Sequence, residues 1–314
     1  MTDPPPPIPA RLAAGAFLLV DKPRGPSSHQ VTAWVRDLLG VERAGHAGTL
    51  DPNVSGLLWV GIGPALKLLP LVLEFPKRYV GAMEFHGEVA AAELARVVAE
   101  FQGPIYQTPP VRSAVRRERR IRTIHRLTVL EAHGTSALLE VVADSGTYVR
   151  TLAVDLGEAL GLGGHLVELR RTGTGPFSES MAVSLAQIAD ARAAADQGDP
   201  APLDRLLHPL AEVWKEFPQI ALRSAAASAV AHGANLARGG ILATSRAFSR
   251  GARVALIVPP ETLIATGTAL VDSADLGGSR EGWVVDTDRV LADPAGFPLA
   301  WKRPDGQAPD AHVK

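Results

Sequence analysis

The sequence predicts an α+β protein with two domains, a larger N-terminal one and a smaller β-rich one. Its 314 residues exceed one small core, since a domain averages about 150 residues. Over the first two thirds of the chain, strand-like patterns alternate with amphipathic helical patterns. Beyond Phe217, residues 253–258 and 263–271 flank the turn sequence PPET, which predicts a hairpin. We place the domain boundary near residue 215.

A strand and a capped helix are predicted to open the N-terminal domain. Residues 16–20 are apolar and form a short predicted strand. After Pro26, Ser27 or Ser28 can cap a helix, because a serine oxygen accepts from a free amide in the first turn. Gly40 is expected to end this helix. Its apolar side chains recur at helical spacing: Val31, Trp34, Val35 and Leu38.

Further elements follow from the same periodicities. A stretch at 190–210 is rich in alanine and acidic residues and is predicted to form a connector helix. The chain shows no internal repeat. Strands are predicted at 79–86, 126–132, 137–143 and 283–286, and helices at 93–101 and 150–160.

The first ten residues contain five prolines, which predicts a flexible or polyproline arm. The predicted organisation therefore has four parts. They are an arm at 1–15, the larger domain at 16–215, the β-rich domain at 216–293 and a tail at 294–314.

The composition excludes several kinds of site. The chain has no cysteine, which rules out disulfides, thiolate zinc sites and a cysteine nucleophile. Its nine histidines form no ligand pair of the His-Glu-x-x-His type, and we predict no metal. The apolar segment at 16–20 is too short to cross a membrane, which takes about 20 residues. Since no signal peptide precedes it, we expect a soluble cytoplasmic protein.

Positive charge is concentrated in one segment, although the whole chain has a formal net charge of −1. Residues 112–126 hold seven arginines and one glutamate, a net charge of +6. Two interpretations stay open: a solvated charged face, or a surface for a polyanion. Arginine suits phosphate because its planar fork donates two parallel hydrogen bonds.

The stretch GHAGTLDP, residues 45–52, places Asp51 on constrained backbone, since a residue before proline is pushed out of the helical region. One interpretation is a helix cap, because Asp at the cap and Pro at the first helical position are both favoured. The neighbouring residues favour a functional site instead. Two glycines allow a close backbone approach and two polar side chains flank the acid: Gly45, Gly48, His46 and Thr49.

Three other fragments concentrate aromatic and basic side chains. KRYV, at 77–80, puts Tyr79 at the start of a strand. GTYVRTL, at 146–152, is expected to put Tyr148 and Arg150 on one face at a strand end. LRRTGTGPF, at 169–177, joins a leucine and two arginines to a glycine turn. Taken alone, Tyr79 is typical of a core aromatic and Arg150 of a surface arginine.

GHAGTLDP, KRYV, GTYVRTL and LRRTGTGPF, in this order and at these separations, resemble the TruB-type pseudouridine synthases. LLVDKPRGPSSHQV, FQGPIYQTPPVRSAV and the arginine run are most similar to the archaeal and eukaryotic branch, that of the dyskerin-like catalytic subunit of H/ACA ribonucleoproteins. Residues 217–291 resemble a PUA domain, a small RNA-binding barrel. The resemblance covers about residues 16–295, and the ordered set of motifs is specific, although each fragment alone is weak.

The resemblance implies a fold and an activity. The fold is α+β, with a mixed, largely antiparallel sheet, flanking helices (the pseudouridine synthase fold) and a small C-terminal β-barrel. The activity is isomerisation of uridine in RNA, in which uracil leaves its ribose, turns and rejoins through C5 without a cofactor. Because a stacked base cannot turn, it must be flipped into a pocket, at an unpairing cost of a few kcal/mol.

The resemblance also assigns catalytic roles. Asp51 would be the catalytic aspartate, and it must be ionised to act as nucleophile or base. Arg150 would pair with Asp51 and keep it charged. Tyr79 would stack on the flipped uracil, and its hydroxyl would help to remove the C5 proton. Tyr148 would support the position of Arg150.

Further residues are implied in RNA binding. His46 would lie in the loop that displaces the target base, and Leu169 would line the uracil pocket. Lys22 would serve the structure beneath the catalytic loop or contact a phosphate. The pair Lys77-Arg78 stands where a lysine and an acid are more usual, and Lys77 is expected to add positive charge for RNA. The arginine run supplies the rest: Arg112, Arg116, Arg117, Arg119 and Arg120.

Two other functions are alternatives. A catalytically silent RNA-binding scaffold would use the β-rich domain and the arginine run, but it has no need for Asp51, Arg150 and Tyr79 together. A nucleotide-binding enzyme built on the glycines at 161–164 would need a fingerprint that the spacing lacks. Within the leading hypothesis, the target is the TΨC-loop uridine of tRNA, recognised unaided, or uridines chosen by guide RNA in ribosomal RNA. The second case requires the small accessory proteins of an H/ACA particle as partners.

Overall fold

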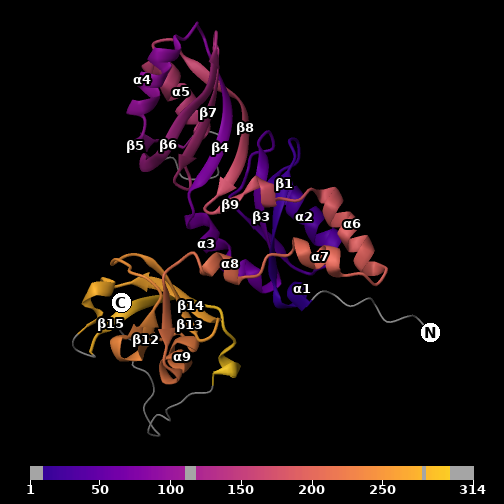
Figure 1. Ribbon diagram of the computed structural model, residues 1–314, viewed down its shortest axis with the longest axis vertical. Coiled ribbons are helices and arrows are strands. Elements are labelled where there is room, and N and C mark those ends of the chain that lie inside the picture. The colour runs from indigo at the N-terminus through magenta and orange to yellow at the C-terminus, as the bar shows by residue number, and fades with distance from the viewer. Residues whose placement is uncertain (1–9, 110–117, 278–280, 298–314) are drawn as a thin grey trace. The chain divides into compact units, whose positions relative to one another are not determined.

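A computed structural model describes residues 10–109, 118–277 and 281–297 of the chain (Figure 1). The chain divides between Leu210 and Ala211 into two compact units. No helix in the described part of the chain is long and apolar enough to cross a membrane.

The first unit is built on a mixed sheet of nine strands. Only the pairing of β3 with β8 is parallel among its pairings, so the prediction of a mixed, largely antiparallel sheet is confirmed. Two short strands pair beside the main path, β2 (Ala44–Ala47) with β3 and β9 (Phe177–Ser178) with β8. The main path runs β1 (Ala16–Lys22), β3 (Ser55–Ile62), β8 (Gly164–Thr174), β4 (Lys77–Phe85), β7 (Ser136–Ala143), β6 (Arg120–His133) and β5 (Gly103–Gln107).

Two apolar cores cover different parts of this sheet. One lies between β1, β3 and the helices α2 (Ser28–Leu39), α6 (Leu185–Asp196) and α7 (Ala201–Leu206). The other lies between β4, β6, β7 and the helices α4 (Ala91–Glu100) and α5 (Val149–Ala159). The central strands β3, β8 and β4 lie side by side between these regions, and the candidate site forms there.

Helix α2 shows how the local sequence sets an element. Ser27 caps it by accepting from the amide of Gln30, and Gly40 ends it in the left-handed region at φ 63°. Val31, Val35 and Leu39 are buried in the core, and each such side chain contributes roughly 1.5–3 kcal/mol, whereas Trp34, which was expected on the same face, is 39% exposed. This predicted helix is confirmed. The remaining short elements of the first unit are α1 (Ala10–Ala14), the 3-10 helix Gly63–Leu68, α3 (Leu69–Glu74) and the 3-10 helix Glu179–Met181.

The second unit has a six-stranded sheet with the helix α9 (Ser224–Ala231) packed into its core. The predicted hairpin is confirmed, because β13 and β14 are antiparallel neighbours. A short helix, α8 (Ala211–Trp214), opens the unit, and the 3-10 helices Arg238–Gly240, Ser273–Leu276 and Pro294–Gly296 link or follow its strands. The strand order is β11 (Leu236–Ala237), β15 (Trp283–Val290), β14 (Thr262–Ala269), β13 (Arg253–Val258), β10 (Gln219–Leu222) and β12 (Ile241–Thr244).

Some local predictions were wrong. Residues 10–14 of the expected flexible arm form helix α1, because Leu12 is buried in the first core. The expected connector helix at 190–210 is two helices, since α6 ends at Asp196 and α7 begins at Ala201. Residues 1–9 and 298–314, which hold the rest of the expected arm and most of the tail, lie outside the described residues.

Candidate active site

Asp51 is an exposed residue in a loop that is anchored by buried residues before and after it. Leu50 and Val54 are both in the core of the first unit, whereas 58% of the Asp51 side chain is exposed. Residues 52 and 53 form a turn, which the amide of Val54 closes by donating to the carbonyl of Asp51 at 3.0 Å. The interpretation of Asp51 as the cap of a helix is therefore wrong. The loop presents its carboxylate to solvent.

Lys22, at the end of β1, holds this loop from beneath. Its fully buried ammonium donates to the carbonyls of Pro23 at 2.9 Å, Pro52 at 3.3 Å and Val54 at 2.7 Å. Burial lowers the pKa of Lys22, and the nearby charge of Asp51 opposes that shift. Because Lys22 is enclosed, its assignment to RNA binding is wrong. Its contacts agree with the other role expected for it, support of the structure beneath the loop that carries Asp51.

Ser28, at the first turn of α2, holds the residue before Asp51. Its buried hydroxyl donates to the carbonyl of Leu50 at 2.9 Å and accepts from the amide of Leu50 at 2.8 Å. Both backbone groups of Leu50 are thus satisfied by one side chain. From the sequence, Ser28 was expected only as a possible helix cap, and Ser27 fills that position.

Arg150 lies opposite Asp51 and forms an ion pair with it through Nη2 and Oδ2. The two residues are 99 positions apart in the sequence. Arg150 is the second residue of α5, which confirms the helix predicted at 150–160 and contradicts the expectation that Tyr148 and Arg150 share a face at a strand end. Its side chain is 49% exposed. The predicted pair is therefore brought together by the fold, with both charged groups open to solvent.

Tyr79 and Leu169 lie on neighbouring central strands. Tyr79 is half-buried on β4 and packs against the second core. Leu169 is buried on β8, where its Cα pairs with that of Gly81. A side chain at Gly81 would lie 3.2 Å from Leu169, so the glycine leaves room for it. Next to Leu169, the surface-directed Arg170 pairs with Asp21 and Glu179.

Sequence reasoning missed Arg171, which is buried beneath the loop. Its Nε donates to the carbonyl of Leu57 at 2.7 Å. Burial lowers the pKa of Arg171, and interaction with Tyr79 opposes that shift. The double arginine in LRRTGTGPF was the available signal. Since Arg170 and Arg171 alternate along β8, one reaches the surface and the other enters the core.

The backbone of Gly48 lies close to the guanidinium of Arg171, as expected from the glycines of this loop. It has φ +68°, and a Cβ atom there would lie 3.1 Å from Nη1 of Arg171. A residue with a side chain would therefore be strained and would press on the guanidinium. Gly45, by contrast, packs against the apolar side chains of Leu66 and Leu69. The glycines of the motif thus have different roles.

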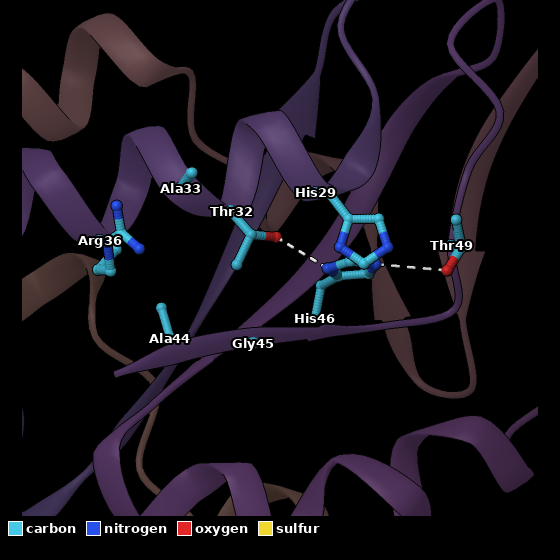
Figure 2. A pocket seen from close by; sticks show the side chains of 8 residues that line it. All are labelled: His29, Thr32, Ala33, Arg36, Ala44, Gly45, His46 and Thr49. Atoms are coloured by element: carbon cyan, nitrogen blue, oxygen red, sulfur yellow. Dashed lines mark hydrogen bonds between the residues drawn. The ribbon is translucent and has the colours of Figure 1, made fainter. Parts of the chain in front are cut away.

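His46 lies on β2, rather than in a loop as expected, and lines a pocket beside the catalytic loop (Figure 2). Its Nδ1 is 3.0 Å from Oγ1 of Thr32, and its Nε2 is 3.3 Å from Oγ1 of Thr49. The ring of His29 meets it edge to face at 4.7 Å. The pocket is lined by His29, Thr32, Ala33, Arg36, Ala44, Gly45, His46 and Thr49.

The hydrogen bonds of Thr32 determine which tautomer of His46 fits. The Thr32 hydroxyl donates its proton to the carbonyl of Ser28 at 2.7 Å, so it can only accept from Nδ1 of His46. Nε2 is then free to accept from Thr49. Burial, followed by electrostatic interactions with His29 and Arg171, lowers the pKa of His46. The imidazole is therefore neutral near pH 7.

Lys77, at the start of β4, is enclosed like Lys22. Its ammonium donates to the carbonyls of Val72 at 3.0 Å, Leu73 at 2.9 Å and Phe75 at 2.6 Å. Burial, with a smaller contribution from Arg171, lowers its pKa to about 7. Because its side chain is only 3% exposed, the expectation that Lys77 contacts RNA is wrong.

Only part of the arginine run is described. Arg119 is exposed, and its guanidinium stacks over the ring of Tyr106 at 4.3 Å. Arg120 begins β6 and lies 3.9 Å from Glu118. Arg126 pairs with Glu140 on the neighbouring strand at 2.7 Å. The others predicted to bind RNA lie outside the described residues: Arg112, Arg116 and Arg117.

No group of three or more histidine, cysteine, aspartate or glutamate side chains that could hold a metal ion is present among the described residues. The site is made of one exposed carboxylate, one exposed guanidinium and a half-buried phenol. Buried cations lie beneath it. This set can hold a charged carboxylate against an organic ring, which suits acid–base or nucleophilic chemistry on a base.

Comparison with protein families assigns most of the chain, from residue 36 to residue 291. Residues 36–149 match the TruB family pseudouridylate synthase N-terminal domain, and residues 150–214 match the tRNA pseudouridylate synthase B C-terminal domain. Residues 218–291 match the PUA domain. The chain belongs to the TruB pseudouridylate synthase family. The predicted fold, with its catalytic sheet and C-terminal PUA domain, is thereby confirmed.

Individual relatives agree with this assignment. A "Probable tRNA pseudouridine synthase B" of Methanothermobacter thermautotrophicus is 41% identical over 296 residues, 94% of this chain and 91% of the relative. A protein with the same description from Pyrobaculum calidifontis is 44% identical over 92% of this chain and 87% of its own length.

Solved structures also match over nearly the whole chain. One chain of a "Cbf5-Nop10-Gar1 Complex" is 36% identical with a TM-score of 0.85, covering 95% of this chain and 93% of its own. Another, from an "H/ACA RNP bound to a substrate RNA containing 2'-deoxyuridine", is 34% identical with a TM-score of 0.82 and covers 96% and 94%.

Proposed function

We propose that this chain is an RNA pseudouridine synthase whose reaction centre is the Asp51–Arg150 pair. The observation that carries the proposal is the exposed Asp51–Arg150 ion pair on a loop whose Leu50 and Val54 share one apolar core with Tyr79 and Leu169. Membership of the TruB family supports the reaction type, an isomerisation of uridine in RNA. The alternative, a silent RNA-binding scaffold, does not require this pair.

Each residue has a role that follows from its position. Asp51 is the ionised group that acts on the flipped nucleotide, and Arg150 keeps its charge in place. Tyr79 supplies an aromatic face for uracil and a hydroxyl beside C5, while Leu169 forms an apolar wall of the pocket. His46, neutral and partly enclosed, occupies the place that the flipped base leaves in the helix.

Two kinds of relative support two kinds of target. The archaeal relatives are described as tRNA pseudouridine synthases, which favours a tRNA uridine and a cytoplasmic site of action. The matching solved structures are described as complexes with Nop10 and Gar1 or as an H/ACA particle on substrate RNA, which favours guide-selected uridines. We propose that the chain works on guide-selected uridines with small accessory proteins, and that it modifies tRNA slowly by itself.

The test uses RNA transcripts whose uridines carry tritium at C5, because isomerisation through C5 releases that hydrogen to water. The lone chain is incubated at catalytic amounts with unmodified tRNA, and in parallel with guide RNA and accessory proteins on a target RNA. We expect slow release from tRNA and fast release in the complete mixture. Full conversion of the TΨC-loop uridine without a guide would contradict the need for partners, and no release in either mixture would contradict the enzyme.

The substitution Asp51→Asn assigns the chemistry to the site. It keeps the size of the side chain and removes the charge, so tritium release should vanish in both mixtures. RNA affinity should be nearly retained, because it depends mainly on phosphate contacts elsewhere. Turnover within about tenfold of the parent would contradict the role of Asp51, since a catalytic carboxylate contributes far more than that.

A further inference from the structure

Near each member of the ion pair, one buried side chain bonds both the amide and the carbonyl of a neighbouring residue. Asp51 follows Leu50, whose amide and carbonyl are both bonded to the buried hydroxyl of Ser28. Near Arg150, the backbone of Tyr148 is held in the same way by a second buried side chain, Gln107. Its Oε1 accepts from the Tyr148 amide at 2.9 Å, and its Nε2 donates to the Tyr148 carbonyl at 3.1 Å.

Gln107 ends β5 and is 3% exposed, although its sequence neighbourhood gives no sign of burial. A buried carboxamide needs partners for both of its polar ends, and here one residue provides both. Tyr148 is extended at φ −98° and ψ 99°, so the amide of Gln107 binds it as a neighbouring β-strand would. The two residues lie 41 positions apart.

This contact fixes the place where α5 begins. Tyr148 is the cap residue of α5, and its carbonyl also accepts from the amide of Leu152 at 3.0 Å. Gly146, two residues before it, has φ +81°, a backbone conformation that glycine adopts without strain. Arg150 is the second residue of the helix. Its direction therefore depends on how firmly Tyr148 is held.

The ion pair cannot fix itself by packing, because both side chains are about half exposed. Long exposed side chains lose rotamer entropy on pairing, and such pairs are weak by themselves. We propose that Gln107 is a positioning residue, which holds Tyr148 on both sides and so aims Arg150 at Asp51. Ser28 likewise positions Asp51, because it holds both backbone groups of Leu50. This inference rests on the proposed catalytic role of the pair.

The test is the single-turnover rate of tritium release with Gln107→Met, which keeps the length of the side chain and removes both hydrogen bonds. A displacement of about 1 Å at a reacting group can cost about 10²-fold in rate, and we expect a loss of that order. RNA affinity should stay unchanged. Gln102→Met is the matched control: Gln102 accepts from the amide of Leu127 on β6, away from the ion pair. It should react at the parental rate.

The second variant, Gln107→Glu, gives a signature that a purely structural residue would not. A protonated carboxyl is an isostere of the carboxamide, since its O–H can donate to the Tyr148 carbonyl while its other oxygen accepts from the amide. The ionised form repels that carbonyl. The rate of this variant divided by the parental rate should therefore rise as the pH falls from 8 to 6, because burial raises the pKa of such a carboxyl. Division by the parental rate removes any pH dependence that the two proteins share.

All rates are measured at a temperature where circular dichroism shows each variant folded. A Gln107→Met rate within about threefold of the parent, which is under 1 kcal/mol, would overturn the proposal. A flat rate ratio for folded Gln107→Glu would overturn it also, and this variant serves if Gln107→Met does not fold. Failure of the proposed function is distinguishable, because it would appear as retained activity in Asp51→Asn.

Discussion

Two sets of charged side chains in the first unit make different kinds of contact. The buried cations, Lys22, Lys77 and Arg171, donate to backbone carbonyls. The exposed pair, Asp51 and Arg150, consists of opposite charges in contact with each other. The buried cations thus satisfy carbonyls of the frame, whereas the pair stays open to a substrate.

The difference shows how one fold combines rigidity with reactivity. Burying a cation costs desolvation free energy, and carbonyl partners offset part of that cost. Groups held in this way cannot turn toward RNA. The exposed pair loses little solvation and can exchange partners when a nucleotide enters. Substitution of a buried cation should therefore change the free energy of unfolding. Substitution in the exposed pair should change the reaction rate.

The largest effect on the rate is expected at Arg150. Arg150→Met removes the partner of Asp51, and single-turnover tritium release should fall by about two orders of magnitude or more. Arg150→Lys keeps the charge but loses the planar fork of the guanidinium. Its rate should lie between those of Arg150→Met and the parent. Arg126→Met, which breaks the exposed pair of Arg126 with Glu140, is the control and should react normally. Equal losses in Arg150→Met and Arg126→Met would contradict a specific role for the pair.

A smaller effect on the rate is expected at Gly48, where the two sets meet. Gly48→Ala places a Cβ atom against the buried Arg171 at a positive φ, and Gly40→Ala meets the same kind of backbone with open space around it. Each should lose about 1–2 kcal/mol of unfolding free energy from left-handed strain. Only Gly48→Ala should also slow the reaction, by about tenfold, because the loop shifts. A parental rate in Gly48→Ala would contradict the expectation that contact of the added Cβ atom with Arg171 shifts the loop.

No effect on the rate is expected at Lys77, but its substitution should change how stability depends on pH. The pKa of Lys77 is 10.5 when unfolded and about 7 when folded. Between those values the unfolded chain binds more protons, so parental stability rises with pH. Lys77→Met lacks this gain. The unfolding free energy of the parent minus that of the variant should increase from pH 7 to 10, by up to about 1.4 kcal/mol per unit. Urea titrations at several pH values measure this difference, and a constant difference would contradict the burial of a titrating ammonium.

Much of the frame could be predicted from local patterns. The caps of α2 and the β13–β14 hairpin depend on residues that are close in sequence. The catalytic candidates could be named because the family motifs contain them, and the fold brings Asp51 and Arg150 together. The helix that begins near Arg150 could also be predicted from its periodicity, whereas the strand end expected at Tyr148 and Arg150 was wrong, because Tyr148 caps that helix.

The supporting residues could not be predicted, for a physical reason. Ser28 and Gln107 satisfy backbone groups that lie 22 and 41 positions away, and no local period encodes such contacts. Lys77 was expected on the surface because lysine is almost never buried, and its bonds to three carbonyls override that tendency. Side chains that complete the frame thus become visible only when the chain is folded.

We propose that the exposed pair carries the reaction and that the buried cations stabilise the surrounding fold. The most direct test applies the same change, cation to methionine, to Arg150 and Lys77 and measures single-turnover tritium release under identical conditions. The account predicts at least about a hundredfold loss for Arg150→Met. It predicts a parental rate for Lys77→Met at a temperature where both variants are folded. A rate that falls equally in both variants, or that falls only in Lys77→Met, would contradict it.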